Sequence, residues 1–187
     1  LRKHERYADA VAAYDAAFLR IGTPQPYHWR LLYARGIALE RAKKWERAET
    51  DFLKALEFEP EQPFVLNYLG YSWVEQGRNL AEAERMIRKA VELRPRDGYI
   101  VDSLGWVLYR LGRYEEAVPH LERAVELRPE DPVINDHLGD AYWSAGRQRE
   151  ARFQWQTALA LKPEPEVRAA IEAKLRQGLI REANATP

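Results

Sequence analysis

Residues 111–129, LGRYEEAVPHLERAVELRP, recur 34 residues later at 145–163 as AGRQREARFQWQTALALKP. A fixed period of this length is typical of repeat proteins, in which each repeat is one supersecondary unit. One period is a residue longer, because QGRNLAEA at 76–83 exceeds the matching stretches by one residue, and we interpret it as a loop insertion. The same spacing relates Pro60, Pro95, Pro129 and Pro163, then Gly36, Gly70, Gly105 and Gly139, and finally Ala55, Ala90, Ala124 and Ala158.

Each period predicts two antiparallel helices. Apolar residues fall at helical spacing at Leu104 and Leu108 in one half and at Leu121 and Val125 in the other. Most prolines lie at the unit boundaries, where a missing amide donor costs little. The recurring glycines and alanines fit two helices that cross closely, so we interpret them as packing residues. Pro119 lies in the first turns of a predicted helix, where we expect a slight kink.

Residues 29–163 resemble the tetratricopeptide repeat, a 34-residue helix–turn–helix unit with a small residue at position 8, alanine at positions 20 and 27 and proline at position 32. The resemblance implies an all-α solenoid, a right-handed superhelix of antiparallel helix pairs. The fit is weakest in the first unit, where position 7 is Arg35 and position 15 is Lys43 instead of leucine and glycine.

We expect one array of about four and a half repeats and an end helix. Tyr7, Ala10, Tyr14 and Ala17 match the second helix of a unit, so further repeats are expected before residue 1. The predicted segments are a partial repeat at 1–22, repeats at 29–62, 63–97, 98–131 and 132–163, a capping helix at 165–180 and a loose tail at 181–187.

Composition excludes several classes of protein. The 187 residues carry 29 Lys and Arg against 29 Asp and Glu, so the basic excess of a nucleic-acid binder is missing. There is no cysteine, and the longest stretch without Asp, Glu, Lys or Arg is the 13 residues 62–74, too short to span a membrane. The histidines are scattered and there is no glycine-rich phosphate loop. We therefore predict neither an enzyme nor a bound cofactor.

The resemblance implies that positions 2, 5, 9, 12 and 13 of each first helix line a concave groove. Those positions are unusually aromatic, which favours recognition of a protein or peptide segment, although aromatic residues at helical spacing are often ordinary core. The predicted groove residues are Tyr33, Phe64, Asn67, Tyr71, Tyr99, Asp102, Trp106, Tyr109, Arg110, Asp136, Asp140 and Trp143.

Three carboxylates fall on the predicted groove, at Asp102, Asp136 and Asp140. They would select a basic group on a ligand, or they are solvated surface charges. A metal held with the adjacent His137 is a third alternative, but two aspartates bind divalent ions poorly, so we predict no metal site. The lysines and asparagines with which some tetratricopeptide domains grip chaperone C-termini are absent at positions 5 and 9, so a cochaperone role is disfavoured.

The run DSLGWVLYRLGR at 102–113 resembles the C-terminal repeats of long proteobacterial tetratricopeptide proteins, which include the LbcA-type outer-membrane lipoproteins. That resemblance implies a scaffold or adaptor for a periplasmic carboxyl-terminal processing protease, tethered to the outer membrane through a segment before residue 1. The alternative is a structural module that self-associates through Tyr7, Tyr14 and Phe18, which we expect to be exposed.

Overall fold

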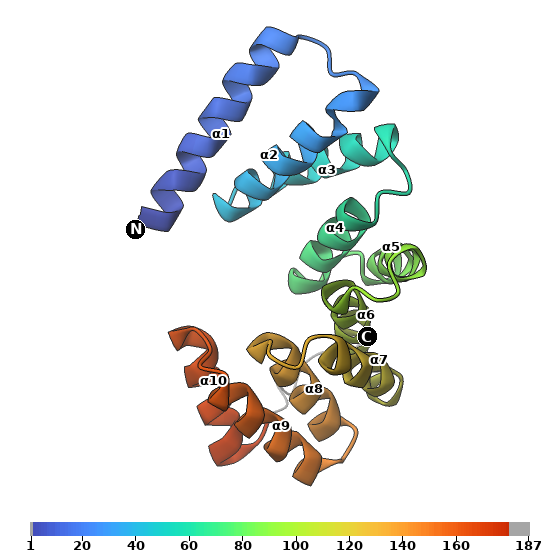
Figure 1. The fold of residues 1–187 in the computed structure, drawn as a ribbon, viewed down its shortest axis with the longest axis vertical. Helices are drawn as coiled ribbons and strands as arrows, with labels where there is room; N and C mark the ends of the chain where they lie inside the picture. The colour runs from blue at the N-terminus through green and yellow to red at the C-terminus, as the bar shows by residue number, and fades with distance from the viewer. Residues whose placement is uncertain (1, 180–187) are drawn as a thin grey trace. The chain divides into compact units, whose positions relative to one another are not determined.

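The computed structural model describes residues 2–179, with side chains from residue 6 onward, and within this range all regular secondary structure is helical. Figure 1 shows the helices following one another as hairpins along the chain. The predicted tail at 181–187 lies outside the described residues. The elements are α1 Arg2–Ile21, a 3₁₀ turn Pro26–His28, α2 Trp29–Arg41, α3 Trp45–Phe58, α4 Pro63–Glu75, α5 Leu80–Leu93, α6 Gly98–Arg110, α7 Tyr114–Leu127, α8 Pro132–Ser144, α9 Gln148–Ala160 and α10 Pro165–Gln177.

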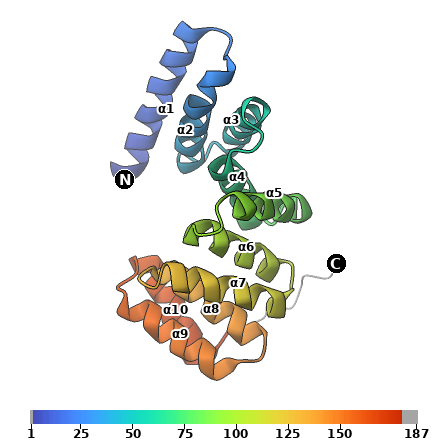
Figure 2. The same cartoon turned by 45° about the vertical axis from the view of Figure 1, so that its right-hand side comes forward.

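The all-α fold predicted from the sequence is confirmed. The first and second helices of a repeat pack on each other, as α2 does on α3, α6 on α7 and α8 on α9. Figure 2 shows the last two of these pairs side by side, with α10 next to α9. Residues 2–179 contain no β-strand.

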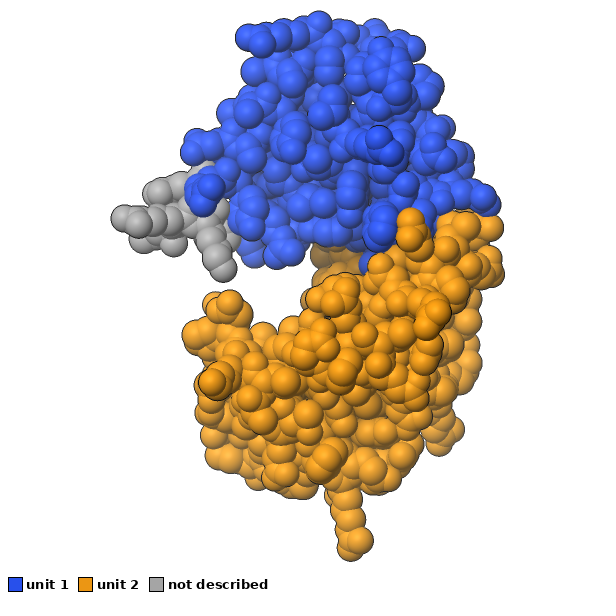
Figure 3. Space-filling view, in the orientation of Figure 1, with its two compact units in different colours: residues 1–69 blue, residues 70–187 orange. Residues whose placement is uncertain are grey.

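The chain divides into two compact units, residues 1–69 and residues 70–187, coloured separately in Figure 3. The division falls inside α4. Unit 1 therefore holds α1 to α3 and the start of α4, whereas unit 2 holds the end of α4 and α5 to α10. In unit 2, Val101, Ala124 and Ile134 form a buried apolar cluster that joins α6, α7 and α8.

Each glycine at position 8 lies against one large side chain of the second helix of its repeat. Gly36 faces Phe52 and Gly70 faces Ile87, and the same relationship recurs between Gly105 and Leu121 and between Gly139 and Trp155. A Cβ atom added to any of these glycines would lie within 3 Å of that side chain. The predicted packing role is thus confirmed, since a larger residue would separate the two helices.

The turns inside the repeats need left-handed backbone conformations. Gly77, Gly112 and Gly146 have φ values of 65°, 76° and 82°, which glycine adopts without a Cβ penalty. Lys43, at the equivalent place in the first unit, has φ 63° in spite of its side chain. Asn79 has φ 49° and accommodates the extra residue of the second period.

Local signals also account for the helix ends in unit 2. Asp97 and Asp131 precede α6 and α8 and accept hydrogen bonds from the first amides of those helices, for example from Val133 N at 2.9 Å. α7 continues without interruption through Pro119. On α10, Glu172 and Arg176 occupy positions that hold leucine or an aromatic residue in α6 and α8, so the face of α10 that carries these positions is polar.

Arg35 gives unit 1 a polar centre where the repeat pattern expects leucine. Its guanidinium binds Asp51 through two hydrogen bonds of 2.7 and 2.8 Å and Asp15 through a third of 3.0 Å. It also lies 4.0 Å from the ring centroid of Phe18. The expectation that Phe18 is exposed is therefore wrong, because Arg35 covers its ring and the side chain is buried.

Candidate functional site

The groove face of unit 2 is the surface formed by its first helices: the end of α4, then α6, α8 and α10. The first contact across it joins α4 to α6, where the Trp106 indole N–H donates to Glu75 Oε1 at 2.7 Å. Arg110 adds an ion pair with the same carboxylate at 3.9 Å. Nearby Tyr71 is largely buried, and burial together with the Glu75 and Asp102 charges raises the pKa of its phenol.

The second contact joins α6 to α8. Asp102 is buried and lies 3.0 Å from Nδ1 of buried His137. Burial lowers the pKa of His137, but the carboxylates of Asp102, Asp136 and Asp140 together raise it by more, so the net change in the pKa is upward. The Trp106 ring stacks on His137 with centroids 4.0 Å apart and on Tyr109 with centroids 4.8 Å apart. Trp106 is therefore stacked on two other rings.

The third contact joins α8 to α10. Lys174 Nζ lies 2.8 Å from Asp136 Oδ1 and 2.8 Å from Asp140 Oδ2, and all three side chains are largely buried. Trp155 Nε1 donates to Asp140 Oδ1 at 2.9 Å. Burial raises the pKa of Asp140 to about 6 in spite of the opposing Lys174 charge. Burial lowers the pKa of Lys174, but the two carboxylates raise this pKa by a larger amount, so the net change is upward.

The end of α10 covers the last predicted groove residue. Gly178 lies against the Trp143 ring, where an added Cβ would collide with it. The opposite neighbour of Trp143 is Trp155, with ring centroids 5.4 Å apart. Arg152 lies 5.5 Å from the Trp143 ring centroid and also donates to the Leu175 carbonyl at 2.5 Å. Trp143 thus largely mediates contact between the α8–α9 repeat and the end of α10.

The predicted groove residues of unit 1 are less regular. Tyr33 packs edge-on against Tyr68 with centroids 6.0 Å apart and lies 6.2 Å from the Phe52 ring. Phe64 is 40% exposed. The Asn67 side-chain oxygen is buried without a hydrogen-bond partner in the structure, which leaves an acceptor available.

The structure brings most of the predicted residues of unit 2 onto one face but gives the carboxylates a different setting. Asp102, Asp136 and Asp140 are buried and paired within the chain rather than displayed to solvent. Sequence reasoning missed their partners, His137 and Lys174. Lys174 lies one 34-residue period after Asp140, so it occupies position 9 of the repeat numbering on α10. This repeat register was the signal that could have identified Lys174 as a partner.

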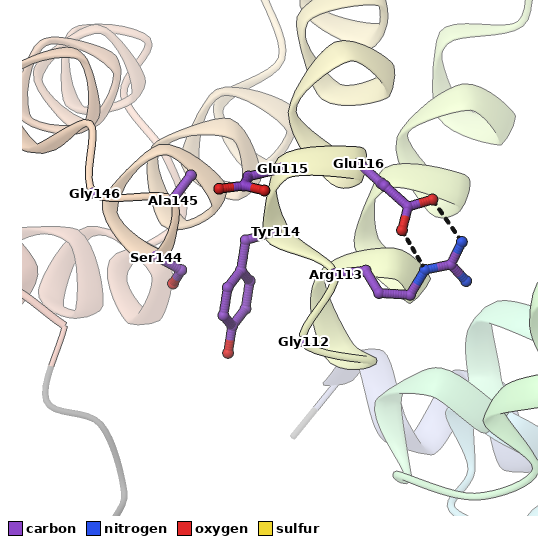
Figure 4. A pocket seen from close by; sticks show the side chains of 8 residues that line it. All are labelled: Gly112, Arg113, Tyr114, Glu115, Glu116, Ser144, Ala145 and Gly146. Carbon is purple, nitrogen blue, oxygen red and sulfur yellow. Dashed lines mark hydrogen bonds and ion pairs between the residues drawn. The ribbon is translucent and has the colours of Figure 1, made fainter.

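A shallow pocket of about 500 Å³ lies between the α6–α7 and α8–α9 turns (Figure 4). Its glycines, Gly112 and Gly146, form the turns themselves. Arg113 at its edge is already bound to Glu116 at 2.6 Å and to Glu84 at 2.8 Å. The pocket therefore presents the backbone and side chains of two turns rather than a convergent set of reactive groups.

No three His, Cys, Asp or Glu side chains of residues 2–179 are grouped so that they could hold a metal ion. Within the same range, no helix combines the length and apolar character needed to cross a bilayer.

Comparison with known proteins identifies the repeat. A family profile for the TPR repeat matches residues 105–146, and one for the tetratricopeptide repeat matches residues 1–63. No functionally curated protein sequence matches significantly.

Solved structures share the fold at low sequence identity. MamA from AMB-1 is 24% identical with a TM-score of 0.68, and the match covers 85% of this chain and 91% of MamA. TTC0263, a thermophilic TPR protein of Thermus thermophilus, is 21% identical with a TM-score of 0.73 and 92% of each chain covered. YrrB, described as a TPR protein with an unusual peptide-binding site, is 20% identical with a TM-score of 0.67, covering 92% of this chain and 87% of YrrB. Residues 1–63 and 105–146 therefore match tetratricopeptide-repeat profiles, and the chain has the tetratricopeptide solenoid fold.

Proposed function

We propose that the protein is a non-catalytic scaffold that binds a peptide or protein segment on the groove face of unit 2. The observation that carries this proposal is the stack of Tyr109, Trp106 and His137 across α6 and α8. Rings held in place by neighbours offer contact area at little cost in conformational entropy. The similarity in fold to YrrB, described as having a peptide-binding site, supports the same class of function.

The polar contacts across the face define what such a ligand meets. Glu75, Asp102, Asp136 and Asp140 all have partners inside the chain, so the face has little unpaired charge to offer. An apolar or aromatic side chain that packs against the edges of the stacked rings suits this surface better than a highly charged ligand. The aspartates would then act by holding the helices in register.

The finer assignment rests on the resemblance of residues 102–113 to LbcA-type lipoproteins. We propose that the protein works in the periplasm, tethered to the outer membrane through a longer chain, as an adaptor for a carboxyl-terminal processing protease or for envelope assembly. An envelope extract passed over the immobilised chain tests this proposal. A processing protease retained by the wild type but not by a Tyr71, Trp106 and Trp143 triple-alanine variant would support it, and equal retention by both would oppose it.

Selection of peptides on the intact chain tests the groove directly. A random twelve-residue library would be selected on the wild type, and an enriched peptide would be labelled for fluorescence anisotropy. We expect Trp106→Ala to weaken binding by about 2 kcal/mol, close to thirtyfold in Kd. Phe153→Ala is the matched control, since Phe153 is a 68% exposed aromatic residue on the second helix α9.

This control distinguishes binding at the groove face from nonspecific binding of the peptide to exposed aromatic residues. Phe153→Ala should leave Kd within about twofold of the wild type, because substitutions away from a contact are near neutral. Circular dichroism would confirm that every variant keeps its helices. Weakening by Phe153→Ala together with unchanged binding by Trp106→Ala would place the site on the other face and reject the groove assignment.

Self-association is the second candidate, favoured by exposed apolar residues on unit 1. Leu19 is 86% exposed and Tyr27 is 75% exposed, at the end of α1 and in the turn that follows it. Light scattering over a concentration series tests this candidate. A dimer that Tyr14→Glu abolishes would support it, whereas a monomer at all concentrations would oppose it.

A further inference from the structure

A second surface of unit 2 lies away from the stacked rings, at the junction of two repeats. The loop between α5 and α6 and the end of α7 enclose a notch of about 380 Å³. Arg94, Arg96 and Arg128 line this notch, and all three are exposed. Asp97 is the acidic residue of the lining, and its Oδ1 already accepts the Tyr99 amide at 3.1 Å. We call this surface the arginine notch.

The loop that forms the arginine notch differs in charge from its counterparts in the other repeats. Arg96 follows the boundary proline Pro95, and the residue in the same place is Glu61, Glu130 or Glu164 after the other boundary prolines. Of the four boundary prolines spaced by one period, Pro95 is the one that is not followed by an acid. No side-chain partner of Arg96 is present within residues 6–179. Its charge is thus available to a ligand.

Gly98 makes room for the second arginine. A Cβ atom on Gly98 would lie 2.5 Å from Arg128 Cγ. At the equivalent position α4 and α8 both begin with proline, so a residue without a side chain is particular to α6 among these three helices. The absence of a side chain lets the Arg128 stem lie across the start of α6. Its guanidinium carbon then reaches a point 4.7 Å from the centroid of the Tyr99 ring. The glycine and the arginine thus form one local arrangement at this boundary alone.

The chemistry of the arginine notch indicates which anion it suits. Asp97 already occupies the amides of Tyr99 and Ile100, the groups at a helix start that would otherwise bind a compact phosphate. Arginine side chains bind carboxylates through paired hydrogen bonds. Tyr99, which is 50% exposed, adds an aromatic surface beside the charges. Glu130 lies 3.7 Å from Arg128, and both side chains are exposed, so this ion pair compensates the Arg128 charge only weakly.

We propose that the arginine notch binds an acidic segment of a partner protein, with carboxylates on Arg96 and Arg128 and a neighbouring side chain on Tyr99. The proposal goes beyond the groove, because the guanidinium groups belong to the repeat junction and not to the stacked rings. Exposed charges at the edge of an interface increase the rate of association, and added salt weakens this effect. The notch would orient a partner that the chain also holds elsewhere.

Fluorescence anisotropy with a labelled hexaglutamate peptide and the full chain tests the proposal at low ionic strength. We expect Arg96→Glu, which restores the acid of the other repeats, to weaken binding about tenfold. Gly98→Ala should also weaken it, by displacing Arg128. Hexaglutamine should not bind, and added salt should reduce the affinity for hexaglutamate.

Matched controls decide the result. Arg149→Glu makes the same charge change at an exposed position on α9, outside the notch, and should leave binding within about twofold. Trp106→Ala should likewise leave hexaglutamate binding unchanged, so failure of the groove and failure of the notch can be told apart. Equal weakening by Arg149→Glu and Arg96→Glu would overturn the proposal. Tighter binding of inorganic phosphate than of hexaglutamate would overturn the choice of an acidic segment.

Discussion

Lys174 on α10 lies 2.8 Å from Asp140 on α8, in a setting from which solvent is largely excluded. The same ammonium group contacts Asp136, one turn earlier on α8. The terminal helix is therefore held to the last repeat by a buried cation shared between two carboxylates as well as by apolar contacts such as that of Ile171. Buried charges of this kind are costly to break, because removing one partner leaves the others unpaired.

Replacing Lys174 by methionine should destabilise the protein by about 3 kcal/mol at pH 7.5, measured by urea unfolding. The pKa of Asp140, about 6 in the fold, exceeds its ordinary value of 3.8. The folded state therefore binds more protons between these values, and stability rises as the pH falls through this range. Protonation relieves the unpaired carboxylates, so the loss should be smaller at pH 5. Lys174→Arg is the charge-preserving control, and an equal loss at both pH values would contradict the assignment.

The pair of His137 and Asp102 should make stability depend on pH near neutrality. Because the folded pKa of His137 is raised above 6.5, its charged form contributes stability that is complete below pH 6.5 and is lost as the pH rises through the folded value. Asp136, Asp140 and the stacked Trp106 ring also face this imidazole. The melting temperature of His137→Gln should thus fall furthest below that of the wild type near pH 6 and approach it in alkaline buffer. A constant difference across the range would show that the pair acts only by packing.

Arg35→Leu restores the leucine of the repeat pattern but should destabilise unit 1. Asp51, which is buried, would lose both hydrogen bonds from the guanidinium, at a cost of about 3 kcal/mol. The double variant Arg35→Leu with Asp51→Leu should recover most of that loss, since apolar side chains can replace a buried ion pair. Urea unfolding of the two variants gives the comparison. A double variant no more stable than the single one would indicate that Asp15 or Phe18 carries the effect.

Lys43→Gly should stabilise the protein by about 0.5 kcal/mol, measured by urea unfolding. Lys43 has φ 63°, so its Cβ atom strains the turn, and the side chain is exposed and gains no burial in return. The gain is partly offset by the greater freedom of glycine in the unfolded chain. Asn79→Gly is the matched control, because asparagine tolerates φ 49° and should gain less. Equal or lower stability of Lys43→Gly would contradict the strain argument.

Much of the fold followed from periodicity. Gly105 and Gly139 repeat because each must pass a large side chain of its partner helix, and this constraint acts within one repeat. Exposure was harder to predict from the pattern. Phe18 lies at an apolar position of a half repeat, yet the guanidinium of Arg35, from the following helix, covers it. Contacts between helices separated along the chain determine which apolar residues remain in water.

Spacing within one period was enough to predict the repeat, the helices and the packing glycines, because each of these depends on contacts inside one repeat. The environment of the predicted groove carboxylates depended instead on packing between successive repeats. Asp102 and Asp140 became buried partners of His137 and Lys174, which lie about one repeat further along the chain. Whether a carboxylate binds a ligand or forms an internal ion pair depends on the side chain that packs beside it. The stacking of successive repeats determines which side chain that is.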